Sequence, residues 1–147
     1  MERLTIKELA PYLPYKLQWK FEGSDEVHEV MGIDITDFGV HLFSPYGDYG
    51  KCRIDEGKPL LRHLSSLTKE IEHNGEMFVP KDKIHNYTKV DENGTLYVLV
   101  DGTQWQSDPL RWDYETVNWL ISLHFDVFGL IDRGLALPID EKEVEGE

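Results

Sequence analysis

The stretch that decides the fold is Lys16-Leu-Gln-Trp-Lys-Phe-Glu22, in which polar and apolar residues alternate without interruption. Leu17, Trp19 and Phe21 share one parity, which is the pattern of a strand with one buried face. Gly23-Ser-Asp25 follows directly and supplies the residue types of a turn. The stretch therefore predicts the first strand of a sheet.

Three further strand patterns follow at short spacing. We expect strands at residues 26–34, 38–43 and 49–55, separated by turns at 36–37 and 44–48. Short strands joined by tight turns indicate an antiparallel meander, and a small sheet of this kind can curl into an SH3-like barrel.

Helices are expected on both sides of this sheet. Before it, Thr5 and Glu8 have the spacing of a capping box for a short helix over residues 5–10, which prolines then end. After it, the chain from Lys58 is expected to leave the sheet. A helix is then expected over residues 67–73, capped by a preceding serine and ended by Asn74-Gly75.

The longest predicted element is a helix over residues 114–128, capped by Asp113. Its apolar face repeats at helical spacing and comprises Val117, Leu120, Ile121, His124, Phe125 and Phe128. Trp119 and Leu123 add a second apolar flank. We therefore expect this helix to be buried, and a homodimer through the helix near 114–128 is one way to bury it.

Together these elements predict an α+β fold: a small N-terminal antiparallel sheet followed by a mixed α/β segment that ends in a buried helix. We expect either a single compact unit or two sub-domains. These would comprise residues 1–62, which are β-rich, and residues 63–139, which are α+β. Residues 140–147 hold five acidic residues and one lysine, and are expected to form an acidic disordered tail.

The charge of the chain excludes several classes of function. Its 147 residues include 15 Lys and Arg against 28 Asp and Glu, a net charge of −13. Proteins that hold phosphate backbones by charge need a basic surface, so no direct nucleic-acid binding is expected. Leu, Ile, Val and Phe make up 42 residues, enough for a folded core rather than a disordered acidic chain.

The sequence also predicts where the protein works. Cys52 is the only cysteine, so no intrachain disulfide is expected. The start of the sequence has no apolar core of a signal peptide, and no apolar run approaches the ~18 residues that span a bilayer. We therefore expect a cytoplasmic protein without a membrane partner.

The histidines and the cysteine form no strong catalytic or metal-ligating pattern. Glu70 and His73 have the Glu-x-x-His spacing of carboxylate metal sites, but no second pair occurs. His28 and His41 lie on neighbouring predicted strands and can face each other, yet a metal would need a third ligand. Cys52 lies inside a strand pattern, as a small buried residue does. With no phosphate-binding glycine loop either, we expect no catalytic residues, metal or cofactor.

Four aromatic residues on predicted loops are the candidate binding residues. Tyr46 and Tyr49 lie in a turn with proline and glycine, and Trp105 and Trp112 lie in a polar segment. Loop aromatics often anchor a partner, because they bury much area at low entropic cost. The alternative, which we weigh equally, is that they fold down over the small core.

Three segments carry a family resemblance, at the start, middle and end of the chain. They are Leu4-Thr-Ile-Lys-Glu-Leu-Ala-Pro-Tyr-Leu-Pro-Tyr15, Lys58-Pro-Leu-Leu-Arg-His-Leu-Ser-Ser-Leu-Thr-Lys-Glu-Ile-Glu-His-Asn-Gly-Glu-Met-Phe-Val-Pro80 and His124-Phe-Asp-Val-Phe-Gly-Leu-Ile-Asp-Arg-Gly-Leu-Ala136. In these segments the chain resembles an uncharacterised family of short proteins from phages, prophages and mobile elements of gut Bacteroidetes. The resemblance implies a phage or mobile-element setting inside a bacterial cell, and it carries over no activity and no functional residue.

Three classes of function follow from these observations. The first, which the loop aromatics and the resemblance favour, is a non-enzymatic accessory protein that binds an unknown protein partner. The second is an acidic DNA mimic that inhibits a nucleic-acid-binding protein, which would need ordered rows of carboxylates. The third is a small enzyme with an unfamiliar site. That site would combine a carboxylate with at least two of His28, His41, Cys52, His63, His73 and His124.

Overall fold

The protein is described from a computed structural model, which covers residues 3–34, 39–43, 49–84 and 87–139. At residues 34, 39–43 and 49–52 the backbone alone is described. The chain divides into two compact units. Unit 1 contains Met1–Leu61 and Phe128–Ile139, and unit 2 contains Arg62–Val127.

Unit 1 begins with the predicted short helix, α1 (Ile6–Leu9), which continues as a 3₁₀ helix, η1 (Ala10–Tyr15). The capping box is confirmed. The Glu8 amide donates to Thr5 Oγ1 at 3.4 Å, and the Thr5 amide donates to Glu8 Oε1 at 3.2 Å. These bonds satisfy amides that the first turn of a helix leaves without partners.

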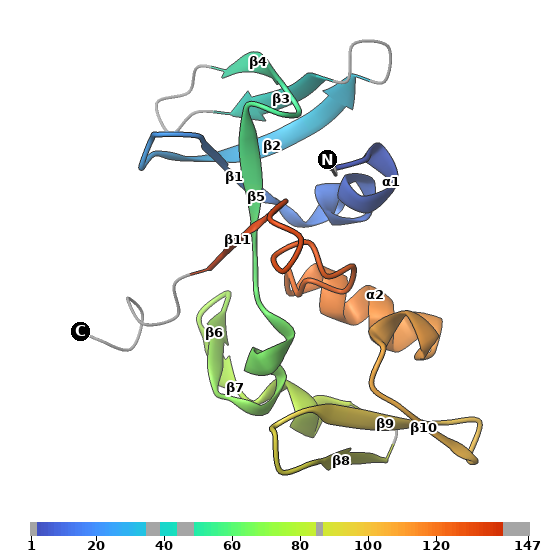
Figure 1. Ribbon diagram of the computed structural model, residues 1–147. Helices are drawn as coiled ribbons and strands as arrows, with labels where there is room; N and C mark the ends of the chain where they lie inside the picture. The colour runs from blue at the N-terminus through green and yellow to red at the C-terminus, as the bar shows by residue number, and fades with distance from the viewer. Residues whose placement is uncertain (1–2, 35–38, 44–48, 85–86, 140–147) are drawn as a thin grey trace. The chain divides into compact units, whose positions relative to one another are not determined.

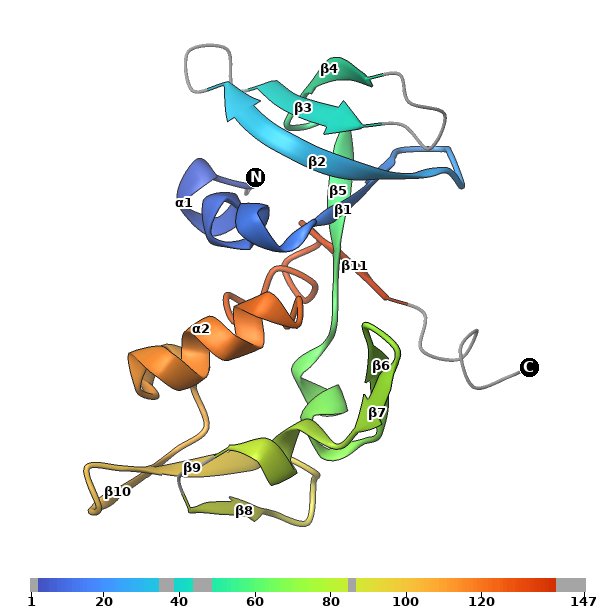
Figure 2. The same ribbon diagram turned by 180° about the vertical axis from the view of Figure 1, so that it is seen from behind.

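The predicted meander is confirmed, and with it the α+β fold class. Strands β1 (Gln18–Phe21), β2 (Val27–Asp34), β3 (Gly39–Phe43) and β4 (Tyr49–Arg53) pair in order, each antiparallel to the next. Figures 1 and 2 show this sheet from opposite sides.

The prediction that the chain leaves the sheet at Lys58 is wrong. Gly57–Leu61 forms β5, which pairs antiparallel with β1, and Leu137–Pro138 forms β11, which pairs parallel with β5. The strand order is therefore β11-β5-β1-β2-β3-β4. Among the described residues β4 and β11 do not pair, so this sheet is open and is not a closed barrel.

The pairing of β5 with β1 depends on Gly57. A Cβ at this position would collide with the indole Nε1 of Trp19 and would lie 2.6 Å from the Lys20 carbonyl oxygen. Trp19 has no exposed surface and is among the largest fully buried side chains of the chain. The missing side chain of Gly57 therefore lets β5 approach the central tryptophan of unit 1.

Residues 128–139 complete unit 1 from the far end of the chain. The Ile139 amide donates to the Leu61 carbonyl at 2.8 Å, and Arg133 Nη1 donates to Glu8 Oε2 at 2.7 Å. The sequence grouped these residues with the sub-domain 63–139, whereas here they belong to the same unit as residues 1–61. Unit 2 is thus an insertion in the sequence between β5 and β11.

Unit 2 is built from many short elements. Two are small antiparallel sheets: β6 (Ile71–His73) with β7 (Glu76–Phe78), and β8 (Thr88–Val90), β9 (Leu96–Val100) and β10 (Gln104–Gln106) in the order β10-β9-β8. The helical elements are η2 (Leu64–Thr68), η3 (Pro80–Lys83), η4 (Pro109–Arg111) and α2 (Tyr114–Ser122).

The helix predicted over residues 67–73 is wrong, because this segment ends in a β-hairpin. Asn74 and Gly75 have φ values of 54° and 83°, and they connect β6 to β7. Two successive positive φ values are the geometry of the two-residue hairpin turn that Asn-Gly favours. The Asn-Gly pair therefore closes a hairpin instead of ending a helix.

The last predicted helix is confirmed at its start and is too long by six residues. Asp113 caps α2 by accepting from the Thr116 amide at 3.1 Å, but the helix ends at Ser122. The His124 amide donates to the Ile121 carbonyl and the Phe125 amide donates to the Leu120 carbonyl, which is the Schellman pattern of a helix end. His124 occupies its left-handed position, with a φ of 68°.

Pairing with Arg62 explains why α2 stops there. The Arg62 amide donates to the His124 carbonyl at 2.7 Å, and the Asp126 amide donates to the Arg62 carbonyl at 2.9 Å. Phe125 thereby forms a parallel bridge with Arg62 and is fully buried. Leu123 and Phe125 are buried, as predicted, but they lie beyond the end of the helix, whereas Phe128 is only half-buried.

Candidate functional site

The register of the three-stranded sheet brings five side chains to one face. Lys89 of β8 lies opposite Tyr97 of β9, and Trp105 of β10 lies opposite Leu99 of β9. Tyr87 joins them, because its carbonyl accepts from the Leu99 amide at 2.9 Å. Side chains alternate between the faces of a strand, so these five residues share one side. We call them the aromatic face.

The two faces of this sheet differ sharply in exposure. Leu96 and Val98, which point to the opposite side, are buried in the core of unit 2, while Val90 at the edge of that side is 42% exposed. On the aromatic face, Tyr87 is 78% exposed and Trp105 is 39% exposed. Clustered exposed aromatic side chains are typical of binding surfaces, whereas single exposed apolar residues are common everywhere.

Lys89 lies across the rings of the aromatic face. Its ammonium is 4.4 Å from the centre of the Trp105 ring and 5.8 Å from the centre of the Tyr97 ring. Both distances are within the range of cation–π attraction. The rings of this face are therefore oriented to receive a cation, and an internal lysine already uses that property.

Carboxylates lie in the turns at both ends of the aromatic face. Asp91, in the turn from β8 to β9, accepts from the amides of Asn93 and Thr95 at 2.9 and 3.0 Å and from the Tyr97 hydroxyl at 3.3 Å. Asp101, in the turn from β9 to β10, is exposed and has a φ of 55°. The aromatic face is thus framed by negative charge.

The structure separates the two candidate tryptophans. Trp105 lies on the aromatic face, whereas Trp112 is only 6% exposed, and its indole Nε1 donates to the Gln106 carbonyl at 2.8 Å. Trp112 therefore belongs to the core of unit 2. Of the candidate tyrosines, Tyr46 lies outside the described residues, and Tyr49 is the first residue of β4, with its backbone alone described.

Three residues of the aromatic face besides Lys89 were missed by the sequence predictions: Tyr87, Tyr97 and Leu99. A signal was present, since these residues recur at alternate positions in two short stretches on either side of Asn93-Gly94. An Asn-Gly pair between alternating stretches is the strongest short-range sign of a hairpin. Combining the turn with the alternation would have placed these side chains together.

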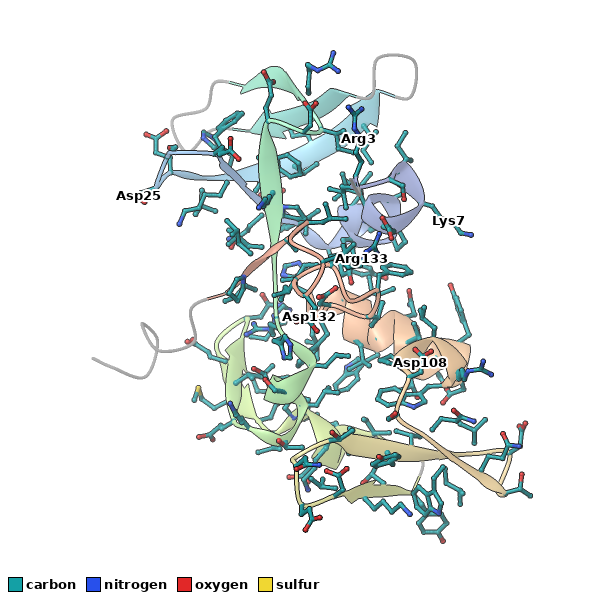
Figure 3. The ribbon with its side chains drawn as sticks, in the orientation of Figure 1. Arg3, Lys7, Asp25, Asp108, Asp132 and Arg133 are labelled. Carbon is teal, nitrogen blue, oxygen red and sulfur yellow. The ribbon has the colours of Figure 1, made fainter. Side chains whose placement is uncertain are left out.

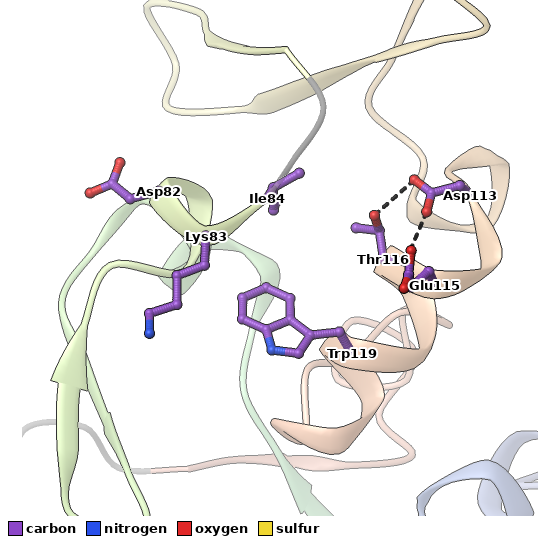
Figure 4. Close-up of a pocket in the computed structure, with 7 residues that line it drawn as sticks. All are labelled: Asp82, Lys83, Ile84, Asp113, Glu115, Thr116 and Trp119. Atoms are coloured by element: carbon purple, nitrogen blue, oxygen red, sulfur yellow. Dashed lines mark hydrogen bonds between the residues drawn. The ribbon is translucent and has the colours of Figure 1, made fainter.

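A pocket of about 530 Å³ opens between α2 and η3 (Figure 4). Trp119 of α2 lines one wall, and Lys83 and Ile84 line the other. Its polar groups already have structural roles. Asp113 caps α2, and Lys83 Nζ lies 3.0 Å from Glu76 Oε2 and 4.8 Å from the centre of the Phe78 ring. The pocket thus presents no paired acid and base for catalysis.

The structure does not bring together the residues of either metal site that the sequence suggested. Glu70 precedes β6 and His73 ends it, so the two do not share a helical face. His41 lies opposite Gly32, four residues from His28, so the two histidines do not face each other across the strands. Among the described residues no three His, Cys, Asp or Glu side chains are grouped to hold a metal ion.

A buried arginine organises the centre of unit 2, and no sequence pattern indicated it. Arg62 is 6% exposed. Its Nε donates to the Leu123 carbonyl and its Nη2 donates to the Glu72 carbonyl, both at 2.9 Å. The same Nη2 lies 3.4 Å from Nδ1 of His73, whose ring packs edge-on against His124 with centres 5.9 Å apart.

This environment suppresses the charge of His73. Burial lowers the pKa of His73 below its ordinary value of 6.5, and the positive charge of Arg62 lowers it further. A neutral His73 can accept a hydrogen bond from Arg62 through Nδ1, whereas a protonated one cannot. Arg62, His73 and His124 therefore join the hairpin β6–β7 to the end of α2.

One Ser–His contact bears on the enzyme hypothesis. Nδ1 of His63 accepts from the Ser65 amide at 3.1 Å and lies 3.0 Å from Ser65 Oγ. His63 is the N-cap residue of η2, so this contact forms the cap of a helical turn. The geometry is local and structural rather than that of a nucleophile with its base.

The apolar residues that predicted a homodimer are partly buried within the chain, while Val117 and Phe128 are half-buried. Leu120, Ile121 and Phe125 are each at most 6% exposed. The most exposed large side chain of α2 is Tyr114, at 82%. The homodimer stays a prediction, which sedimentation equilibrium over a range of protein concentrations will test.

The chain matches no protein-family model, no curated protein and no solved structure. Within the described residues, the helices are all too short or too polar to cross a lipid bilayer.

Proposed function

We propose that the chain is a non-enzymatic accessory protein of a phage or mobile element, which acts in the cytoplasm of the bacterial host by binding another protein. The aromatic face carries the binding part of this proposal: Tyr87, Tyr97 and Trp105 are gathered on one side of a sheet whose other side packs Leu96 and Val98 into the core. The phage or mobile-element setting is supported by the sequence resemblance.

The aromatic face favours a partner segment that carries arginine beside apolar residues. Lys89 already lies over two of its rings, which shows that a cation fits against them. A guanidinium stacks on aromatic rings as well and spreads its charge over a plane. The carboxylates at both ends and the net charge of −13 favour a basic partner and would speed its association.

Affinity capture with matched variants tests this proposal. The bait is the full chain, compared with Tyr87→Ala/Trp105→Ala and with Tyr114→Ala, which removes an equally exposed tyrosine from α2. We expect one stoichiometric bacterial protein with wild type and Tyr114→Ala, and its loss with the double variant. Aromatic anchors contribute about 1–3 kcal/mol each, so the purified pair should bind at least about 30-fold more weakly.

The outcome that contradicts the proposal is equal capture by wild type and the double variant, or no partner with any bait. A different result would favour the DNA-mimic alternative, which depends on carboxylates rather than on aromatic rings. In that case the double variant would still capture the partner, and duplex DNA would release it. Circular dichroism of each variant shows whether the fold is retained.

A further inference from the structure

A second cavity, of about 580 Å³, lies in unit 1 and is independent of the aromatic face. Its lining comes from three parts of unit 1: the start of the chain into α1, the connection from β4 to β5, and Leu135. Cavities of roughly 300–1,000 Å³ are the usual size of small-molecule sites. The volume is therefore sufficient for a small organic ligand.

Four apolar side chains contribute to the lining of this cavity. Leu4, Ile6, Ile54 and Leu135 line it, and all four are buried or half-buried. Gly57, which adds no side chain, lines it as well. A ligand held by these side chains needs an apolar body, because they offer it no hydrogen bond.

Besides Thr5, the lining also includes three cationic side chains, in a chain whose net charge is −13. They are Arg3, Arg53 and Lys58, and the acidic residue among them, Asp55, lies 3.4 Å from Arg53 Nε. Within the described residues, Arg3 and Lys58 form no ion pair and no side-chain hydrogen bond. Lys58 is moreover half-buried, so an anionic group would offset the cost of burying its charge.

We propose that this cavity binds a single-chain amphiphile with an anionic head group, for which a medium-chain fatty carboxylate is the simplest member. Its alkyl chain contacts Leu4, Ile54 and Leu135, and its carboxylate pairs with Arg3 and Lys58. An ammonium amphiphile of the same length is repelled by those two residues, and acetate lacks the apolar contacts. Decyl phosphate is anionic as well, with a head-group charge of about −1.5 to −2 at pH 7, and its comparison with decanoate distinguishes fatty carboxylates from phosphate-bearing lipids.

Calorimetric titration of the full chain with decanoate, kept below its micelle concentration, tests the proposal. We expect saturable binding of one molecule per chain. Lys58→Gln and Arg3→Gln each remove one charge-assisted contact and should weaken binding about tenfold. Lys7→Gln is the matched control, because Lys7 is an exposed residue of α1 that does not line the cavity and extends from the start of the chain in a different direction from Arg3 (Figure 3).

The control variants and the other amphiphiles give the results that would overturn or narrow this proposal. Equal weakening by Lys7→Gln and Lys58→Gln would show general charge attraction and overturn it. Decyltrimethylammonium binding as tightly as decanoate would show nonspecific apolar adsorption and overturn it too. Tighter binding of decyl phosphate than of decanoate would keep the anionic amphiphile and reject the carboxylate. Leu135→Ala, which leaves every charge in place, should weaken decanoate and decyl phosphate equally.

Discussion

The two units of this protein solve the problem of burying apolar surface in different ways. Unit 1 builds an open six-stranded sheet around Trp19, with strands of up to eight residues. Unit 2 has strands of three to five residues and joins them through 3₁₀ turns and the side chain of Arg62. One continuous sheet buries side chains by its regular repeat, whereas two small separate sheets need specific polar contacts to keep them in place.

This contrast also assigns different roles to aromatic residues. Trp19 of unit 1 has no exposed surface, while unit 2 leaves Tyr87 and Trp105 on the open side of a sheet. A surface that binds a partner must be positioned by a core elsewhere in the same unit. The buried residues of unit 2, such as Trp112 and Val98, supply that core beneath the aromatic face.

The largest expected effect tests the contrast between the buried tryptophan of unit 1 and the exposed tryptophan of unit 2. Trp19→Ala should lower the free energy of unfolding by about 3–5 kcal/mol, because it removes the largest fully buried side chain of unit 1. Trp105→Ala should lower it by less than about 1 kcal/mol, since that ring is partly exposed. Urea unfolding followed by circular dichroism measures both, and equal losses would refute the contrast.

The next effect tests whether unit 2 depends on its buried arginine. Arg62→Met should lower the free energy of unfolding by about 2–3 kcal/mol, because the carbonyls of Leu123 and Glu72 lose their donors. Arg111→Met is the control, since Arg111 is exposed on η4 and should change stability by less than about 0.5 kcal/mol. If the two variants unfold at the same urea concentration, Arg62 has no special role.

A smaller effect of opposite sign is expected at the end of α2. His124 has a φ of 68°, a conformation that costs about 1–2 kcal/mol in residues with a side chain. His124→Gly relieves this strain and loses the ring contact with His73, so we expect a net gain of about 0.5–1 kcal/mol. His124→Ala keeps the strain and should be less stable than wild type. Thermal unfolding compares the three proteins, and a loss with glycine would contradict the strain argument.

The smallest effects come from pH, with one titrating group in each unit. In unit 2, burial and the charge of Arg62 lower the pKa of His73. Its contribution to the free energy of unfolding is therefore fully present above pH 6.5, and it is lost as the pH falls through the pKa that His73 has in the folded protein. In unit 1, burial raises the pKa of Glu8, but hydrogen bonds from Arg133 and Thr5 outweigh it and hold the pKa below 4.5. The stability that Glu8 contributes is therefore present above pH 4.5 and lost below it.

Single variants separate the pH range in which His73 affects stability from the range in which Glu8 does. His73→Gln should flatten the decline of the urea midpoint that begins below pH 6.5, and Glu8→Gln should leave the midpoint above pH 4.5 unchanged. Glu8→Gln should instead flatten the decline below pH 4.5. A pH profile of His73→Gln that overlays the wild-type profile would show that His73 does not contribute.

The sequence predicted unit 1 better than unit 2 for a physical reason. Strict alternation at residues 16–22 and the Thr5–Glu8 capping box are local patterns, and the structure confirms the strand and the helix they indicate. In unit 2, Asn74-Gly75 suits both a helix end and a hairpin turn. The choice depends on whether Ile71 is buried by strand pairing or by a helical face, which a local pattern does not show.

The candidate binding residues show the same limit of local sequence patterns. The sequence made Trp105 and Trp112 equal candidates, because both were expected on a loop. Tertiary packing buries Trp112 and leaves Trp105 on the aromatic face. Arg62 had no sequence signal, because its partner Leu123 is 61 residues away. Long-range contacts of this kind depend on the arrangement of the whole unit.

By itself, the sequence determined the α+β class, the order of the meander strands and the residue types that cap the helices, because these follow from the residue repeat and from hydrogen bonds within a few residues. Only the tertiary structure decided that β5 returns to pair with β1, that α2 stops at Ser122, and which aromatic residues remain exposed. Each of these is set by a competition between distant segments for the same apolar surface and the same backbone hydrogen bonds.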